Sequence, residues 1–386
     1  MWRHRRTRLA LIGAMLSVAA VGAWIARASP PDTSTLPPKV EPSDPARASK
    51  AKTKVSDETR AALIARAQIW REPEVPINRA SFRDLNLEEV VCRFKVSDLG
   101  GTTPKFDCVL ESGEEIRIKY GNGPEVPAEA AATRLLRALG FGADSITLVR
   151  RLRCFGCPDE PFSTMRAVEV THAEPLFKRV IDENDFEDFQ WVALERKFDA
   201  RAIETERLEG WSFFELDTID QRRGAQRAHI DGIRLIAILM AHWDNKAENH
   251  RLVCLSQTSA DDDNPCTRPF LLMQDVGATF GPPKMDLDAW KQVPIWEDRT
   301  QCVVSMRDLP YEGATFGRAT ISERGRRFIA DRLARLSDAQ LTELFESARF
   351  GEKRGLFTPI YEVADWVRAF RTKVQAISVG PPCPAA

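Results

Sequence analysis

The chain has 386 residues, of which 43% are hydrophobic and 29% are charged, a composition typical of a soluble globular protein with a large core. Its 55 basic and 56 acidic residues give a formal net charge of −1. This balance argues against a globally basic nucleic-acid binder and against an acidic solvating chain, so we expect no nucleic-acid partner.

The N-terminal segment predicts export. Several arginines precede an uncharged stretch from Leu9 to Ala26, which as a helix would span about 27 Å of the roughly 30 Å bilayer core. Ala26, Arg27 and Ala28 also have the small-x-small pattern of a signal-peptidase site. Residues 1–28 are therefore a cleaved signal peptide or a signal anchor that holds the protein at a membrane. In both cases the positive-inside rule predicts an extracytoplasmic location, which is the periplasm, the envelope or the medium.

A linker and one helix are expected next. Residues 29–55 are rich in Pro, Ser, Thr and Lys, and such a segment buries too little apolar surface to fold on its own. Residues 56–80 are predicted to form an amphipathic helix and a connection. Apolar residues recur at near-helical spacing from Ser56 to Trp70, and Ser56 is a suitable N-cap.

Short strands are predicted to dominate residues 81–205. Alternating patterns separated by turns predict three consecutive antiparallel strands, Val90 to Val96, Lys105 to Leu110 and Glu115 to Tyr120. Pro127, in a first turn, opens a helix that ends at Leu139 before Gly140. Further strands are expected near Ile146 to Arg151, Met165 to Val170 and Trp191 to Glu195.

Residues 206–380 predict a mainly helical lobe. The strongly apolar run from Ile230 to His242 is expected to form a buried helix. Amphipathic helices are expected from Glu323 to Leu336, Ser337 to Phe350 and Tyr361 to Ile377. The fold class expected is thus α+β with two lobes, a small antiparallel β lobe with one helix and a larger, mainly α-helical lobe.

Residues suited to phosphate chemistry follow the buried helix. The segment from His242 to Asn249 places an Asp five residues before an Asn, which would let one loop orient a hydroxyl and hold a metal-bound triphosphate. Asp275 ends a buried strand and Gly277 follows it, which suits chelation of Mg²⁺ between phosphates. Upstream, Lys119 lies in the third strand, and the turn from Gly100 to Phe106 joins the first two.

This arrangement resembles the protein-kinase-like fold over residues 81–350. The His242-x-Asp244-x-Lys246-x-x-Asn249 pattern resembles the kinase catalytic loop, and Asp275-Val276-Gly277 resembles its Asp-Phe-Gly motif. The finer pattern is similar to the branch of HipA-type and phosphatidylinositol 3-/4-kinase-type kinases. The turn from Gly101 to Phe106 resembles the Gly-x-x-Pro-Lys loop of that branch, and the segment from Ala193 to Asp199 resembles its hinge. No Ala-Pro-Glu motif follows Asp275.

The resemblance implies a role for each matching residue. Asp244 would be the catalytic base, and Lys246 would approach the γ-phosphate. Asn249 and Asp275 would bind Mg²⁺, with Mn²⁺ as the alternative. Lys119 would bind phosphate and pair with an acid on the following helix, for which Glu129 is preferred and Glu125 is the reserve. The nucleotide would also contact Gly101, Thr102, Thr103, Lys105 and Glu195.

The predicted function is therefore that of an exported atypical kinase that transfers the γ-phosphoryl group of ATP to a hydroxyl, with a protein favoured as the acceptor. The scarcity of ATP outside the cytosol supports an alternative, a non-catalytic pseudokinase that binds a ligand or partner in the cell envelope. The same fold could also act on a lipid or small molecule, or transfer a nucleotidyl group.

The eight cysteines predict disulfides. Cys92 and Cys108 are symmetric about Gly100, and Cys254 and Cys266 are symmetric about Ala260, so antiparallel register would place each pair directly opposite. For the pair Cys154 and Cys157 a tight structural disulfide is preferred, a redox motif is the alternative, and a zinc half-site is third because no second CxxC exists. By elimination, Cys302 and Cys383 remain as a pair.

Overall fold

The computed structural model describes residues 52–83, 89–256, 266–283, 285–310, 313–352 and 359–384, and all of them belong to one compact unit. The predictions for the N-terminal apolar segment and for most of the linker lie outside these residues. Within the described part, no helix has the length and apolar character needed to cross a membrane.

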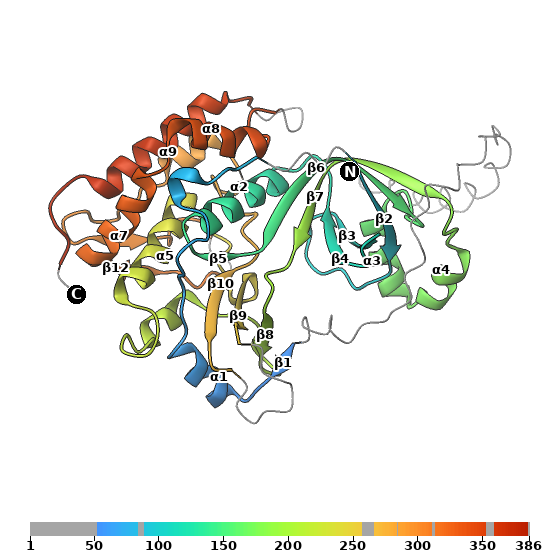
Figure 1. Cartoon of the computed structure of the whole chain (residues 1–386), viewed down its shortest axis with the longest axis horizontal. Helices are drawn as coiled ribbons and strands as arrows, with labels where there is room; N and C mark the ends of the chain where they lie inside the picture. Colours follow the sequence, from blue (N-terminus) through green and yellow to red (C-terminus); the bar gives the residue numbers. More distant parts are fainter. Residues whose placement is uncertain are drawn as a thin grey trace, which may run out of the picture. The chain divides into compact units, whose positions relative to one another are not determined.

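A closed five-stranded barrel forms the first lobe (Figure 1). Its strands, in spatial order, are β2 (Glu89–Lys95), β3 (Lys105–Leu110), β4 (Glu115–Lys119), β7 (Phe186–Arg196) and β6 (Ser145–Phe155). The predicted antiparallel pairing of the first three strands is confirmed. The parallel pairing of β2 with β6, which closes the barrel, joins segments far apart in the chain. Every second residue points inward, and the interior is filled by apolar side chains that include Phe106, Ile118, Val149, Leu152 and Leu194.

The helix predicted after the third strand is α2 (Glu125–Ala138), with Pro127 in its first turn. Its alanine-rich sequence has high helix propensity and lets the helix pack closely, so most of its residues are buried. Gly140 ends this segment with a φ of +91°, and a Cβ there would lie 2.3 Å from the carbonyl oxygen of Arg71. Glycine is therefore required for the turn that leads from α2 back to the sheets.

A second sheet supports the loops of the candidate site. Its order is β1 (Thr53–Lys54), β8 (Arg201–Glu204), β9 (His250–Cys254), β10 (Pro269–Met273) and β5 (Gly142–Ala143). Strands β9 and β10 form an antiparallel hairpin. All residues of β10 are apolar and buried, because both faces of this strand are covered. His250, at the start of β9, is paired with Met273, at the end of β10. The loop that precedes β9 and the loop that follows β10 therefore meet at the same end of the sheet.

Ser56 caps the first helix as predicted, and its hydroxyl accepts a hydrogen bond from the backbone N–H of Thr59. The helix α1 (Asp57–Ile64) is shorter than predicted. Its chain continues in extended form, and Gln68 and Trp70 form single bridges with Phe270 and Phe141. The apolar residues after Ile64 thus serve the sheet and do not extend the helix.

Helices make up most of the second lobe. The run predicted from Ile230 forms α5 (Arg227–Met240), which is buried on nearly all sides. The remaining helices of this lobe are α6 (Leu287–Gln292), α7 (Glu323–Ala334), α8 (Asp338–Ser347) and α9 (Val363–Ser378), and they enclose a core with Trp290, Phe345, Trp366 and Phe370. Short elements complete the chain: η3 (Ile77–Arg79), η4 (Phe213–Thr218), η5 (Ala247–Asn249), β11 (Val303–Ser305) and β12 (Arg318–Thr320). This two-lobed α+β arrangement is consistent with the kinase-like fold class that the sequence predicts.

The prediction of a strand from Met165 to Val170 is wrong. These residues lie in α3 (Pro161–Thr171), which is followed by α4 (Glu174–Val180). Pro161 occupies the first helical turn, where its missing N–H costs nothing, and Met165 is the buried contact that faces the barrel. Helix α3 packs against β3 (Figure 1), so tertiary contact overrides the β-branched composition of this segment.

All the predicted disulfides are present: Cys92–Cys108, Cys154–Cys157, Cys254–Cys266 and Cys302–Cys383. The predicted register is wrong for both hairpins, because Cys92 is opposite Leu110 and Cys254 is opposite Pro269. The first bridge therefore runs diagonally between β2 and β3, and Cys266 of the second lies before the start of β10. The Cα–Cα distances of 5.8 Å and 5.6 Å still suit a disulfide. Four disulfides in the described part favour an oxidising, extracytoplasmic environment.

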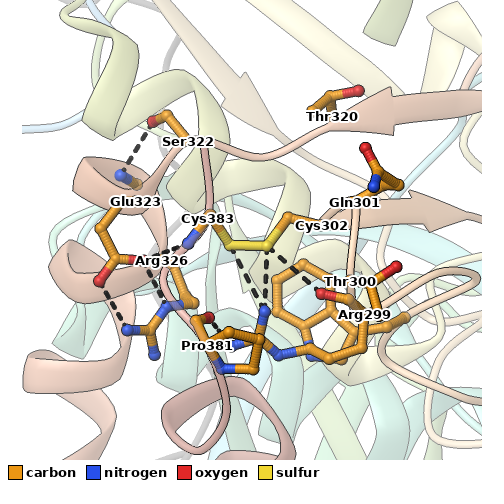
Figure 2. Close-up of a disulfide and its surroundings, with 12 residues drawn as sticks. Arg299, Thr300, Gln301, Cys302, Thr320, Ser322, Glu323, Arg326, Pro381 and Cys383 are labelled. Atoms are coloured by element: carbon orange, nitrogen blue, oxygen red, sulfur yellow. Dashed lines mark hydrogen bonds and ion pairs between the residues drawn. A yellow bond between two sulfur atoms is a disulfide. The ribbon is translucent and has the colours of Figure 1, made fainter. Parts of the chain in front are cut away.

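The disulfide between Cys302 and Cys383 fastens the C-terminal segment to the helical lobe (Figure 2). The backbone N–H of Cys383 donates to Glu323 Oε2 at 2.8 Å, and the guanidinium of Arg326 donates to the same carboxylate. Arg299 donates to the carbonyl oxygen of Pro381 at 2.7 Å. Charge-assisted hydrogen bonds thus surround the bridge on both sides.

A half-buried histidine predicts that the stability of this lobe depends on pH. His229 packs between Trp70 and Phe328, with ring centroids 4.8 Å and 4.9 Å away. Burial, assisted by the charge of Arg332, lowers the pKa of His229 to about 4. Below the unfolded value of about 6.5 the unfolded chain binds a proton that the folded chain does not, so the free energy of unfolding should fall as the pH drops.

Between pH 6.5 and pH 5 this effect should reach about 1–2 kcal/mol. The buried His242 and His250, whose pKa values burial lowers to about 4 and about 3, contribute in the same direction. The share of His229 is therefore the part of the pH dependence, measured by urea unfolding at the two pH values, that His229→Phe removes while keeping the ring contacts. The control is His172→Gln, because His172 is exposed on the surface. An unchanged pH dependence in His229→Phe would contradict the assignment.

Candidate active site

A cleft of about 510 Å³ contains nearly all the sequence-predicted site residues. The barrel contributes the turn between β2 and β3, the end of β4 and the end of β7, and the other lobe contributes the loops that flank the β9–β10 hairpin. The predicted residues that line the cleft are Gly101, Thr102, Thr103, Lys105, Lys119, Glu195, Asp244, Lys246, Asn249 and Asp275. Glu129 stands behind Lys119 and completes the set.

Lys119 and Glu129 form a buried ion pair at the back of the cleft. Lys119 Nζ lies 2.6 Å and 2.7 Å from the two carboxylate oxygens of Glu129, and both residues are buried. Burial alone would lower the pKa of Lys119, but the attraction of Glu129 and other acids prevails and raises it well above its usual value. The lysine therefore stays charged. Of the two acids considered from the sequence, Glu129 makes this pair.

Glu125 instead contacts the turn that covers the cleft, where its carboxylate accepts a hydrogen bond from the hydroxyl of Thr103. In the same turn Gly101 has a φ of +76°, and a Cβ there would lie 3.1 Å from Lys105 Nζ. Glycine therefore leaves room for the lysine beneath the turn. Burial and the neighbouring charge of Lys119 lower the pKa of Lys105.

Glu195 was predicted to belong to a hinge that touches the nucleotide, and the structure places its carboxylate deeper in the cleft. It lies 3.4 Å from Lys119 Nζ and forms a close ion pair with Lys197. Burial opposes ionisation, but the attraction of these two lysines lowers the pKa of Glu195 below its usual range. Glu195 is therefore an ionised partner of the cations in the cleft.

Asn245 fixes the loop that carries Asp244. Its side chain is fully buried, and its Nδ2 donates to the carbonyl oxygen of His242 at 2.9 Å. Its Oδ1 accepts from the backbone N–H groups of Thr315 and Phe316 at 2.8 Å and 2.7 Å. The loop is thus tied to a distant segment of the helical lobe, which restrains Asp244 although its own side chain is partly exposed.

The two candidate metal ligands are joined through the backbone. The N–H of Asp275 donates to the carbonyl oxygen of Asn249 at 3.0 Å, and Asn249 Nδ2 donates to the carbonyl oxygen of Asp244 at 2.6 Å. Because Nδ2 is engaged, Oδ1 is the atom of Asn249 that remains for a cation. Burial opposes ionisation of Asp275, but the charge of Lys119 prevails and lowers the pKa of the Asp275 carboxyl.

Gly277 allows the segment after Asp275 to approach α2. A Cβ at this position would lie 2.4 Å from Cγ of Glu125, so any side chain would displace the Glu125 side chain at the start of that helix. The backbone N–H of Gly277 also donates to Asp275 Oδ1 at 3.4 Å. The small residue predicted from the Asp-x-Gly pattern thus has a local packing reason.

Some cleft residues were missed by the sequence analysis: Arg117, Lys197, Trp243, Glu248, Arg251 and Gln274. Strand alternation offered a signal for the first, because residues two apart on a strand face the same side and Arg117 precedes Lys119 by two. Arg117 is held by Asp107 through two hydrogen bonds. Arg251 lies in β9, and the other four residues lie in connections whose path depends on tertiary packing.

This residue set fits a metal-bound polyphosphate. The amide oxygen of Asn249 and the carboxylate of Asp275 are the hard oxygen ligands that Mg²⁺ prefers. Lys119, Lys105 and Lys246 supply positive charge from both lobes. Chemically, the cleft can hold a polyanion and a divalent cation beside a carboxylate, that of Asp244.

No known protein family model matches the chain, and no curated protein matches it. A search of solved structures finds a proinflammatory kinase from Helicobacter pylori, CtkA, at 10% sequence identity and a TM-score of 0.37. The match covers 75% of this chain and 96% of that one. At this level of similarity the functional conclusions depend on the residues of the chain itself.

Proposed function

We propose that the protein is an ATP- and Mg²⁺-dependent kinase of an atypical type, which acts outside the cytosol and transfers the γ-phosphoryl group to a hydroxyl, with a protein as the favoured acceptor. The observation that carries the proposal is the convergence of Lys119, Asp244, Asn249 and Asp275 on one cleft. The pattern of the turn from Gly101 to Phe106 and of the segment from Ala193 to Asp199 favours the HipA-type and phosphatidylinositol 3-/4-kinase-type branch.

Each residue has a part in such a transfer. Lys119, kept charged and oriented by Glu129, would bind the phosphates nearest the barrel. Asn249 and Asp275 would hold Mg²⁺, which neutralises charge on the phosphates during transfer. Asp244 would accept a hydrogen bond from the acceptor hydroxyl and take its proton as the new P–O bond forms. Lys246 lies with Nζ 3.5 Å from Asp244 Oδ1, where it could follow the γ-phosphate.

The direct test is transfer of labelled γ-phosphate from ATP by the purified protein with Mg²⁺ or Mn²⁺, to itself, to a general protein acceptor and to lipid vesicles. Label is expected on protein. Asp275→Asn should reduce it about 100-fold or more, the scale of one lost electrostatic contact to the transition state. The matched control is Asp331→Asn, on the exposed face of α7.

A thermal-shift measurement with nucleotide and Mg²⁺ separates the alternatives. ATP at 100 times its dissociation constant should stabilise the protein by about 2.7 kcal/mol. Stabilisation without transfer to any acceptor would overturn the kinase proposal and identify a nucleotide-binding pseudokinase. Attachment of the nucleotide moiety, detected with α-labelled ATP, would instead show nucleotidyl transfer.

A further inference from the structure

Two disulfides meet inside the barrel of the first lobe. Cys92–Cys108 joins β2 to β3, and Cys154–Cys157 joins the end of β6 to the turn that follows it. The sulfur atoms of Cys92, Cys108 and Cys154 lie within 4.8 Å of one another, and the Sγ atoms of Cys108 and Cys154 are 3.8 Å apart. Cys154 therefore contacts a second disulfide as well as forming its own.

The strand register makes this contact a built feature of the barrel. Cys92 and Cys154 are direct partners in the parallel pairing of β2 with β6. Cys108 reaches the same point of the interior from β3, and all three residues are fully buried among apolar side chains. The sulfur of Cys108 thus has two neighbours with which it can form a bond, Cys92 and Cys154.

Thiol–disulfide exchange requires a thiolate in contact with a disulfide sulfur. If the bond between Cys154 and Cys157 opens, Cys154 becomes that thiolate, already beside Cys108. The reaction is then intramolecular, and holding the reactants together gives it a high effective concentration. Cys157 is the entry point, because it is only partly buried whereas Cys154 is fully enclosed.

We propose that the barrel is a thiol–disulfide exchange site whose substrate is a dithiol reductant, either a small molecule or a protein. A thiolate of the dithiol attacks Cys157 Sγ, and Cys154 leaves as a thiolate. The second thiolate of the dithiol then attacks the dithiol's other sulfur, which is bonded to Cys157 in the mixed disulfide. The oxidised dithiol departs, and Cys157 is left as a thiol.

Inside the barrel, the Cys154 thiolate attacks Cys108 Sγ. The Cys108–Cys154 bond forms, the Cys92–Cys108 bond breaks, and Cys92 leaves as a thiolate that takes up a proton. In sum, one dithiol becomes a disulfide, and the two protein disulfides become one disulfide and two thiols. Two electrons and two protons have moved from the reductant to Cys92 and Cys157.

The exchange changes what the barrel cross-link restrains. Before it, the bridge ties together the two strands on either side of the turn that covers the cleft. After it, the bridge joins β3 to β6, and the hairpin of β2 and β3 is held by its hydrogen bonds and side-chain packing without a covalent bond. This inference depends on sulfur geometry and is independent of the proposed kinase activity.

The first test frees Cys154 without any reductant. In Cys157→Ser, the exchange should distribute the bond of Cys108 between Cys92 and Cys154. Acid quenching, unfolding and alkylation, followed by peptide mass spectrometry, should therefore find label on both Cys92 and Cys154. Label confined to Cys154 would overturn the proposal.

The matched control is Cys266→Ser, which frees Cys254 in the other hairpin. Among the described residues, the three barrel cysteines are the only cluster in which a third sulfur lies so close, so label should stay on Cys254. Label spread over other cysteines in this control would show general scrambling and would also overturn the proposal.

The second test uses the unmodified protein and therefore does not depend on the folding of a variant. A limiting amount of dithiothreitol, followed by the same quench and mapping, should give a species with Cys92 and Cys157 free and a Cys108–Cys154 bridge. A species with Cys154 and Cys157 free and Cys92–Cys108 intact would show that reduction stops at the surface and that no relay exists.

Discussion

Replacing Asp244→Asn is expected to slow phosphoryl transfer by about 10²- to 10⁴-fold, the range for loss of a general base. Asparagine has the same shape but cannot take the proton of the acceptor hydroxyl. Asn249 donates to the backbone carbonyl oxygen of residue 244, and this hydrogen bond does not depend on the side chain that is replaced. The fold and the affinity for ATP should therefore be preserved.

Single-turnover transfer of labelled phosphate measures the rate, and nucleotide titration measures the affinity. The control is Asp159→Asn, an exposed acid in the connection before α3. If Asp244→Asn transferred phosphate at the wild-type rate, the loop would not supply the base, and the hydroxyl would have to be activated by another group.

Removing the disulfide between Cys302 and Cys383 is expected to cause the largest loss of stability among the four bridges. Its cysteines are 81 positions apart, compared with 12 for Cys254–Cys266. In the chain-entropy treatment, loops of these lengths correspond to about 4–5 kcal/mol and about 3 kcal/mol. The longer loop restricts the unfolded chain more, so its opening stabilises the unfolded state more.

Guanidinium unfolding of the two double Cys→Ser variants would measure this difference. The Cys302/Cys383 variant should also expose the C-terminal segment to protease. Without the covalent bond, that segment would be held by hydrogen bonds such as those to Glu323 and Arg299, which can open transiently. An equal or smaller loss than in the Cys254/Cys266 variant would show that strain or residual structure in the unfolded chain outweighs loop length.

Local patterns in the sequence predicted much of the first lobe. Alternation located β2, β3 and β4 to within a residue, and Ser56 and Pro127 marked helix starts because capping and first-turn proline are local effects. Closure of the barrel was not predicted, because the pairing of β2 with β6 joins distant segments and has no local signature.

Errors arose where tertiary contact decides between two local possibilities. The segment around Met165 has β-branched residues, yet packing of α3 against the barrel makes it helical. Cys92 and Cys108 were paired for the wrong reason, because the turn between them is asymmetric and shifts the register by two residues. A diagonal bridge remained possible, so the disulfide was predicted correctly and its register was not.

The motif residues of the candidate site lie in one cleft, as predicted from the sequence. The ion pairs around them were not predicted. Glu195 was assigned to a hinge, and its ion pair with Lys119 follows from the closeness of β4 and β7 in the barrel. Such pairs depend on which strands are neighbours, and this information is absent from the spacing of residues along the chain.

The closed barrel also determines how another protein can bind. Each of its five strands has a neighbour on both sides, so it presents no free edge to which an extended peptide could add as a further strand. The outer strands of the second sheet, β1 and β5, are only two residues long. These two sheets therefore resist aggregation through their edges, and we expect a protein acceptor to be recognised there through loops and helices.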